Sequence, residues 1–159
     1  MTPFARAYEY QLRNVVNDLL ATLEGIPDEV FNTWKPVAAG EGGHEMNTFA
    51  ALAIHAVSAG EFMTLHAVGS EPSQRNREAE FEATGSQVDI VARYGRWLDG
   101  VHALMAGFTD ADLDRDSYSE RYRERDWKAA EILLHALDHT ALHVGHLQVQ
   151  RQLWEMERR

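Results

Sequence analysis

The chain contains no cysteine among its 159 residues. This absence excludes disulfide bonds, thiolate zinc sites, iron–sulfur clusters and catalysis by a cysteine nucleophile. It also fits a reducing compartment, and we therefore expect a cytoplasmic protein. The chain has eight histidines, by contrast, and this unusual supply of imidazole is the main candidate for its chemistry.

Basic side chains are few relative to acidic ones. The chain has 15 Lys and Arg and 25 Asp and Glu, which gives a formal net charge of −10. Neutralising nucleic-acid phosphates requires a basic face, so this balance argues against a nucleic-acid partner. Long apolar runs are also missing, and none approaches the roughly 20 residues that span a bilayer. The segment MTPFARAYEYQLRN lacks the basic-then-apolar order of a signal peptide. We therefore expect a soluble protein with no membrane partner.

Strand alternation of useful length is absent as well, and apolar residues recur instead at steps of three and four. This period predicts four helices, at about residues 3–24, 47–68, 87–108 and 127–157. Four such helices favour an all-α fold, a four-helix bundle with long inter-helix loops, in a single domain over residues 1–159. Because long loops can cross the end of a bundle, the pattern does not imply simple up-down-up-down order.

Breaking and capping residues mark the expected helix ends: Gly25, Asn47 or Thr48, and Ser86. Two polar segments interrupt the apolar period, at residues 69–86 and 109–126. Both are expected to be surface loops, the second with a short turn at TDADL.

The last predicted helix is apolar on two sides. One broad face holds its histidines together with Ile132, Ala136, Leu147, Leu153 and Trp154. Leu133, Leu137 and Val144 lie nearly opposite. A helix of this kind either is central in its fold or packs against another subunit. We expect a homodimer contact, with burial inside the chain as the alternative.

Four histidines on this helix carry the strongest chemical signal: His135, His139, His143 and His146. Their spacings of four, four and three residues place them within about 80° of arc on a helix. Imidazoles one turn apart can converge on one cation. Burying several of these rings without partners would cost roughly 1–3 kcal/mol each, which a metal or a hydrogen-bond network would remove. The spacing does not say which pair is used.

A third ligand must come from a neighbouring helix. The candidates are His55 and His66 on the second predicted helix and His102 on the third. Apolar neighbours flank His55 on its own face, so we expect it to point into the bundle. Candidates for a general base are Asp138 and Glu61, which project away from the histidines, and a loop set of Glu41, His44 and Glu45.

Three blocks of sequence resemble the DinB/YfiT-like family of metal-dependent proteins. They are WKPV leading into NTFAALAIHAVSAGEF, then TDADLDR, and then DWKAAEILLHALDHTALHVGHLQ, which is similar to the family's terminal H-x-x-x-H block. The resemblance implies a four-helix bundle, often dimeric, with a divalent ion held by His55, His139 and His143. His146 stands where the family often has glutamine, and it could bond a metal-bound water or serve as a fourth ligand. His135 is expected to be packed or to support the ligands.

The resemblance also implies candidate functions. Three imidazoles suit zinc or nickel best, with iron, manganese and cobalt as alternatives. Relatives include maleylpyruvate isomerase and transferases that use bacillithiol, mycothiol or glutathione. A low-molecular-weight thiol S-transferase acting on a small-molecule substrate is therefore the leading expectation, and its thiol would come from the cosubstrate. The alternatives are a metal-dependent hydrolase and a non-catalytic metal-binding or stress-associated protein.

Overall fold

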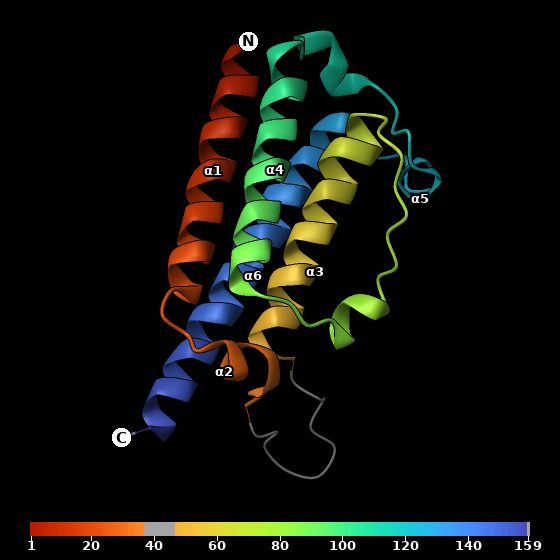
Figure 1. The fold of residues 1–159 in the computed structure, drawn as a ribbon. Coiled ribbons are helices and arrows are strands. Elements are labelled where there is room, and N and C mark those ends of the chain that lie inside the picture. Colours follow the sequence, from red (N-terminus) through yellow and green to blue (C-terminus); the bar gives the residue numbers. More distant parts are fainter. Residues whose placement is uncertain (37–46, 159) are drawn as a thin grey trace.

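The computed structural model describes residues 1–36 and 47–158 (Figure 1). Within these residues all the regular elements are helical, and the only bridge pairs Asp116 with Lys128. Four long helices form a bundle: α1 (Pro3–Leu23), α3 (Phe49–Glu61), α4 (Gln87–Ala106) and α6 (Ala129–Glu157). The shorter elements are α2 (Asp28–Thr33), α5 (Glu120–Arg123), the π-helix η1 (Phe62–Val68), and the 3-10 helices η2 (Ala79–Glu82) and η3 (Asp110–Asp114). The predicted all-α bundle is confirmed.

The helix ends follow local capping chemistry. The side chains of Thr48 and Ser86 accept hydrogen bonds from backbone amides in the first turns of α3 and α4. Both residues are therefore N-caps, as the sequence predicted. Gly25 follows α1 with a φ of +76°, a left-handed conformation that glycine adopts without strain. The guanidinium of Arg151 on α6 then donates to the carbonyls of Ala21, Thr22 and Glu24 at the end of α1.

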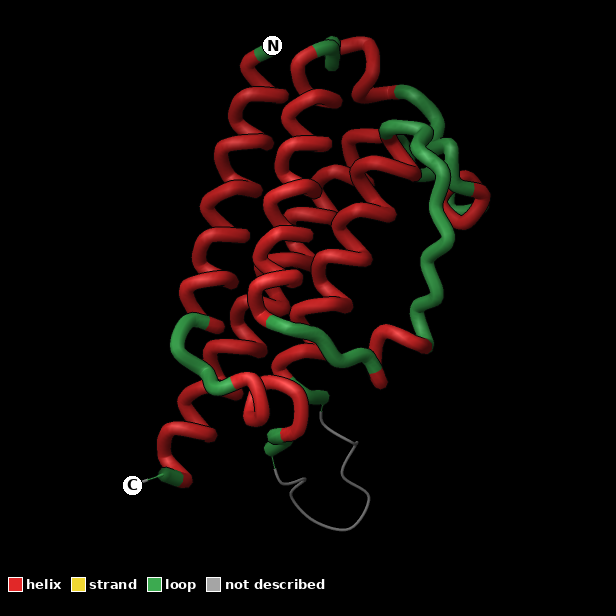
Figure 2. The backbone as a smooth tube through the Cα atoms, in the orientation of Figure 1, coloured by secondary structure: helices red, strands yellow, loops and turns green. Residues whose placement is uncertain are grey.

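The long helices run in a down-up-up-down order (Figure 1). α1 and α6 run one way, α3 and α4 run the other, and each helix packs against two neighbours around a square. The parallel pair α3 and α4 needs a long return, and residues 69–86 supply it along the outside of α3 (Figure 2). This crossover brings residues distant in sequence onto the face of α3.

Most of the apolar side chains on the two faces of α6 are covered within the chain, although Leu153 on the histidine side is 40% exposed. Ile132 and Leu147 on the histidine side are fully buried, and so is Leu133 on the other side, with Val144 7% exposed. Because α6 lies between α1 and α3 and fills the core, Leu133 and Val144 are covered by the chain itself, which is the alternative to a subunit contact that the sequence left open. Whether the protein dimerises stays a prediction.

Residues 49–68 form a helical stretch that is long and apolar enough to cross a membrane, and no other in the described residues qualifies. Of its most apolar window, 67% is buried inside the bundle. This burial is consistent with the core helix of a soluble protein. Small residues in this helical stretch let its neighbours approach closely. A Cβ added at Gly60, for example, would lie 2.2 Å from Cζ2 of Trp97.

The crossover corrects the expectation of a purely surface loop over residues 69–86. Most of its side chains are exposed, but Glu80 in η2 is 5% exposed and points into the bundle. The segment begins at the end of the π-helix η1, which continues α3, and there the Gly69 amide donates to the carbonyl of Thr64 at 2.9 Å. Such π-helical turns are often found at functional sites.

Candidate metal centre

Three histidines meet between α3 and α6. His55 comes from the middle of α3, and His139 and His143 come from successive turns of α6. One ring nitrogen of each lies within 4.8 Å of the corresponding nitrogens of the other two. The ring centroids are 5.2 Å apart for His55 and His139, 4.9 Å for His55 and His143, and 4.6 Å for His139 and His143. The structure thus brings together the three residues that the sequence singled out.

The three rings are kept neutral by their surroundings. Burial, reinforced by the neighbouring histidines, lowers the pKa of His139 to about 4 and the pKa of His143 to about 3. Burial also lowers the pKa of His55, although hydrogen bonding to Glu80 opposes this effect. Neutral imidazoles have a free lone pair near pH 7, which is the form that binds a metal ion.

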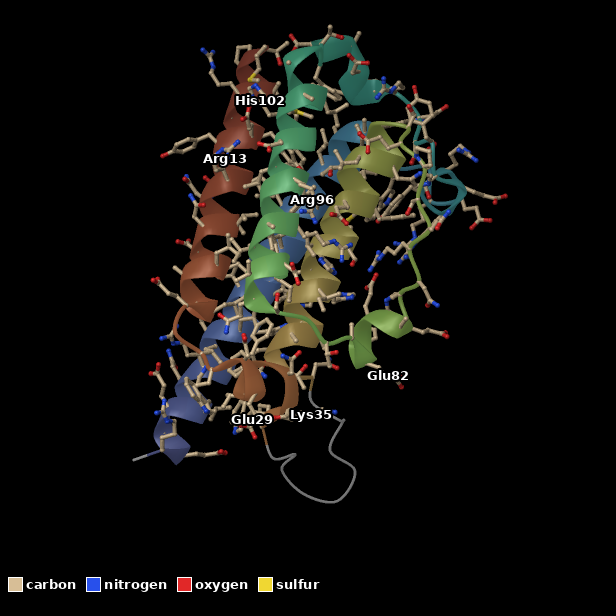
Figure 3. The ribbon with its side chains drawn as sticks, viewed as in Figure 1. Arg13, Glu29, Lys35, Glu82, Arg96 and His102 are labelled. Atoms are coloured by element: carbon tan, nitrogen blue, oxygen red, sulfur yellow. The ribbon has the colours of Figure 1, made fainter. Side chains whose placement is uncertain are left out.

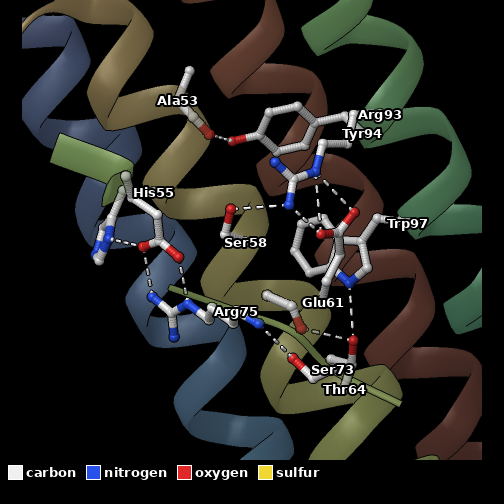
Figure 4. Close-up of polar contacts among 12 residues, drawn as sticks. Ala53, His55, Ser58, Glu61, Thr64, Ser73, Arg75, Arg93, Tyr94 and Trp97 are labelled. Carbon is white, nitrogen blue, oxygen red and sulfur yellow. Dashed lines mark hydrogen bonds and ion pairs between the residues drawn. The ribbon is translucent and has the colours of Figure 1, made fainter. Parts of the chain in front are cut away.

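Glu80 fixes the orientation of His55, and Figure 4 draws the contacts that its carboxylate makes with the labelled His55 and Arg75. Its Oε2 lies 2.8 Å from Nδ1 of His55, and Arg75 donates to both carboxylate oxygens, at 2.6 and 2.8 Å. Burial alone would raise the pKa of Glu80, but the hydrogen bonds from Arg75 and His55 outweigh it and lower that pKa. An ionised carboxylate can only accept, so Nδ1 of His55 donates and its Nε2 is free for a ligand.

The other two rings have an unsatisfied polar atom. Nδ1 of His139 and Nδ1 of His143 are buried and have no hydrogen-bond partner among the described residues. Buried polar atoms are normally paired, and an unpaired one commonly marks a site for an ion or a water. The unpaired nitrogens, the three neutral rings and the carboxylate behind one of them together fit a divalent ion of borderline softness.

The remaining histidines lie outside this cluster. His146 is exposed, with its ring centroid 5.4 Å from that of His143, and it is not one of the three converging ligands. His135 is one turn before His139 and packs edge-on against Trp127. His66 bonds to the carbonyl of Glu71 at 2.6 Å, and His102 bonds to Glu9 at 2.9 Å (Figure 3). His44 lies outside the described residues, as do Glu41 and Glu45.

A cleft of about 280 Å³ opens directly onto the cluster. His55 and His139 form part of its wall, and the rest comes from the end of α3, η1, the crossover, α5 and the start of α6: Ala59, Met63, Arg75, Arg77, Arg121, Tyr122 and His135. A small molecule could therefore reach the histidines from solvent. The arrangement has the parts of an accessible metal site: three protein ligands and an approach from one side.

Comparison with known families agrees with this geometry. The family model of the DinB superfamily matches residues 11–147, which include α3, the crossover and the histidine turns of α6. The chain belongs to the DinB superfamily. A search of curated proteins finds no match. Membership supports the bundle and a histidine cluster compatible with metal binding, whereas it assigns this DinB protein no particular reaction.

Glu80 and Arg75 are parts of the site that the sequence did not predict. Both lie in a polar stretch with no periodicity, and nothing in the spacing connects them to His55, which precedes Glu80 by 25 residues. The one available signal was Phe81, the sole aromatic residue of the stretch, whose ring stacks on His55 at 4.9 Å. The two general-base candidates, Glu61 and Asp138, lie outside the histidine cluster, since Glu61 pairs with Arg93 and Asp138 is exposed.

Proposed function

We propose that this protein is a metal-dependent enzyme whose divalent ion is bound by His55, His139 and His143. The observation that carries the proposal is the convergence of three neutral imidazole nitrogens within 4.8 Å beside an open cleft. Zinc or nickel is the expected ion, because both suit nitrogen ligands. His146 is exposed and lies outside the converging set, which favours a site with a position left for a solvent or substrate ligand.

Within this proposal the reaction is transfer of a low-molecular-weight thiol to a small electrophile. An ion with three neutral ligands keeps its full charge and lowers the pKa of a bound thiol or water. Glu80 and Arg75 hold His55 in the tautomer that presents Nε2, and Phe81 covers its ring. Met63 and Tyr122 give the cleft an apolar wall. The chain has no cysteine, which supports a nucleophile supplied by a cosubstrate.

Metal analysis of the purified protein tests the ligand set. We expect about one zinc or nickel ion per chain in the wild type, and loss of the ion in His139→Ala. His102→Ala is the matched control, because His102 is exposed and remote from the cluster (Figure 3). Full occupancy and unchanged metal affinity in His139→Ala would overturn the assignment.

Turnover is tested separately, with bacillithiol, mycothiol and glutathione each offered together with a chloro-dinitrobenzene electrophile. Metal-dependent conjugation with any of these thiols supports the transferase. Metal-dependent hydrolysis of an activated ester without thiol would favour the hydrolase instead. A stably bound ion with neither activity would favour the non-catalytic metal-binding protein.

We further propose a cytoplasmic homodimer, built on a surface of α6 that shares only Leu153 with the two apolar faces noted in the sequence. Apolar side chains that share about 100° of arc remain exposed along this helix: Leu134, Leu142, Val149, Leu153 and Met156. A straight stripe of this kind can pack against its own copy about a two-fold axis. Light scattering should give a dimer mass for the wild type, a monomer for Leu142→Glu, and a dimer for the control Val88→Glu on α4.

A further inference from the structure

The cleft beside the histidine cluster is basic, although the chain as a whole has a net charge of −10. Three arginines line it, Arg75, Arg77 and Arg121, and no aspartate or glutamate does. An acidic protein repels anions over most of its surface. A cleft with only cationic and neutral side chains is therefore a local exception, and it lies where a substrate must enter.

Arg75 differs from the other two arginines, because its guanidinium is bound to both carboxylate oxygens of Glu80. Arg77 and Arg121 have no such partner. Within the described part of the chain neither guanidinium makes a hydrogen bond or an ion pair, and each lies over an aromatic ring, 5.2 Å from Phe81 and 5.8 Å from Tyr122. These rings place the two side chains while their donors stay available.

Arg77 and Arg121 come from separate segments of the chain. Their meeting in one cleft is therefore produced by the fold and not by a single basic stretch of sequence. Arg77 lies in the crossover just before η2, and Arg121 lies in α5. Phe81 stacks on His55, and Tyr122 stacks on Trp127, whose ring packs against His135. Both arginines are thus supported by rings that belong to the walls of the histidine site.

We propose that this cleft binds a small molecule through an anionic group, a carboxylate or a phosphate, held by Arg77 and Arg121. Planar guanidinium groups with free donors match the oxygens of such anions. The proposal deepens the proposed function, on which it rests in one respect: the bound molecule would direct its reacting atom toward the three histidines. Anion recognition itself does not need the metal.

Metal-free protein provides the first test, with glutarate as the probe and its uncharged analogue glutaramide as the comparison. Calorimetry should detect glutarate binding at least tenfold tighter than glutaramide binding. Arg77→Gln and Arg121→Gln should each weaken glutarate binding by about tenfold, since hydrogen bonds to charged groups are the stronger ones. Arg96→Gln is the control, because this substitution removes the same charge from an exposed position on α4 (Figure 3).

Cobalt-loaded protein provides the second test, with 3-mercaptopropionate and 2-mercaptoethanol compared through their thiolate-to-cobalt absorption. The carboxylate of the first thiol should raise its affinity, and Arg121→Gln should remove that advantage. Equal affinity for glutarate and glutaramide, or equal losses in Arg96→Gln and Arg121→Gln, would overturn the proposal. Anion selectivity in a protein that binds no metal would instead refute the proposed function and leave the anion site standing.

Discussion

Nδ1 of His55 lies 2.8 Å from Oε2 of Glu80, and this contact joins the middle of α3 to a segment 25 residues later. Both side chains are 6% exposed. The carboxylate therefore acts on the imidazole with little competition from water. A histidine that binds a metal commonly donates its other ring nitrogen to such a group, which fixes the tautomer and raises the basicity of the ligand nitrogen.

Replacing Glu80 tests this relationship. Glu80→Gln keeps the shape but removes the charge, and we expect metal affinity to fall by about 10- to 100-fold. Competition with a chromophoric chelator measures the affinity. Glu82→Gln is the matched control, two residues away in the same 3-10 helix but exposed (Figure 3). Equal affinities for Glu80→Gln and Glu82→Gln would show that the carboxylate has no influence on the site.

Arg75 is expected to matter for stability through Glu80. Arg75→Met leaves a buried carboxylate with only His55 beside it, and breaking such a pair costs roughly 3–5 kcal/mol. We expect a loss near the lower end, because the Arg75 side chain is 12% exposed. The double variant Arg75→Met with Glu80→Gln should recover part of this loss, since no unpaired charge remains. Urea unfolding of the single and double variants measures the coupling free energy between Arg75 and Glu80. Strictly additive losses in the free energy of unfolding would contradict this coupling.

The helices and the histidine stripe of α6 could be predicted from local spacing, whereas the choice of His55, His139 and His143 came from the resemblance to the DinB/YfiT-like family. Periods of three and four set the bundle, and a four-residue step places His139 and His143 on one face of α6. Glu80 could not be found in this way, since its approach to His55 depends on the path of the crossover. Burial of Leu133 likewise depends on tertiary packing, because a second apolar face can be covered by its own chain or by another.

The stability of the metal-free protein should fall in mildly acidic solution. His139 and His143 are held neutral in the fold, so the unfolded chain takes up protons more readily than the folded one. Their contribution is complete above the ordinary pKa of 6.5 and is lost as the pH falls toward about 4 for His139 and about 3 for His143. Unfolding by urea between pH 7 and pH 4 measures the slope. His143→Phe should flatten it and His102→Gln should not, whereas an unchanged slope in His143→Phe would contradict the assigned burial.

Gly60 is expected to be essential for packing on the helix that holds His55. A Cβ at this position would lie 2.2 Å from Cζ2 and 2.4 Å from Cη2 of Trp97, whose indole Nε1 is bound to Thr64 at 2.9 Å and cannot easily retreat. Gly60→Ala should therefore destabilise the fold by about 1–3 kcal/mol or more. Gly95→Ala on α4 meets nothing within 4 Å, and it should stabilise by roughly 0.5–1 kcal/mol. Thermal unfolding of both variants compares the effects, and a shift of the same sign in both would mean that Trp97 can move aside.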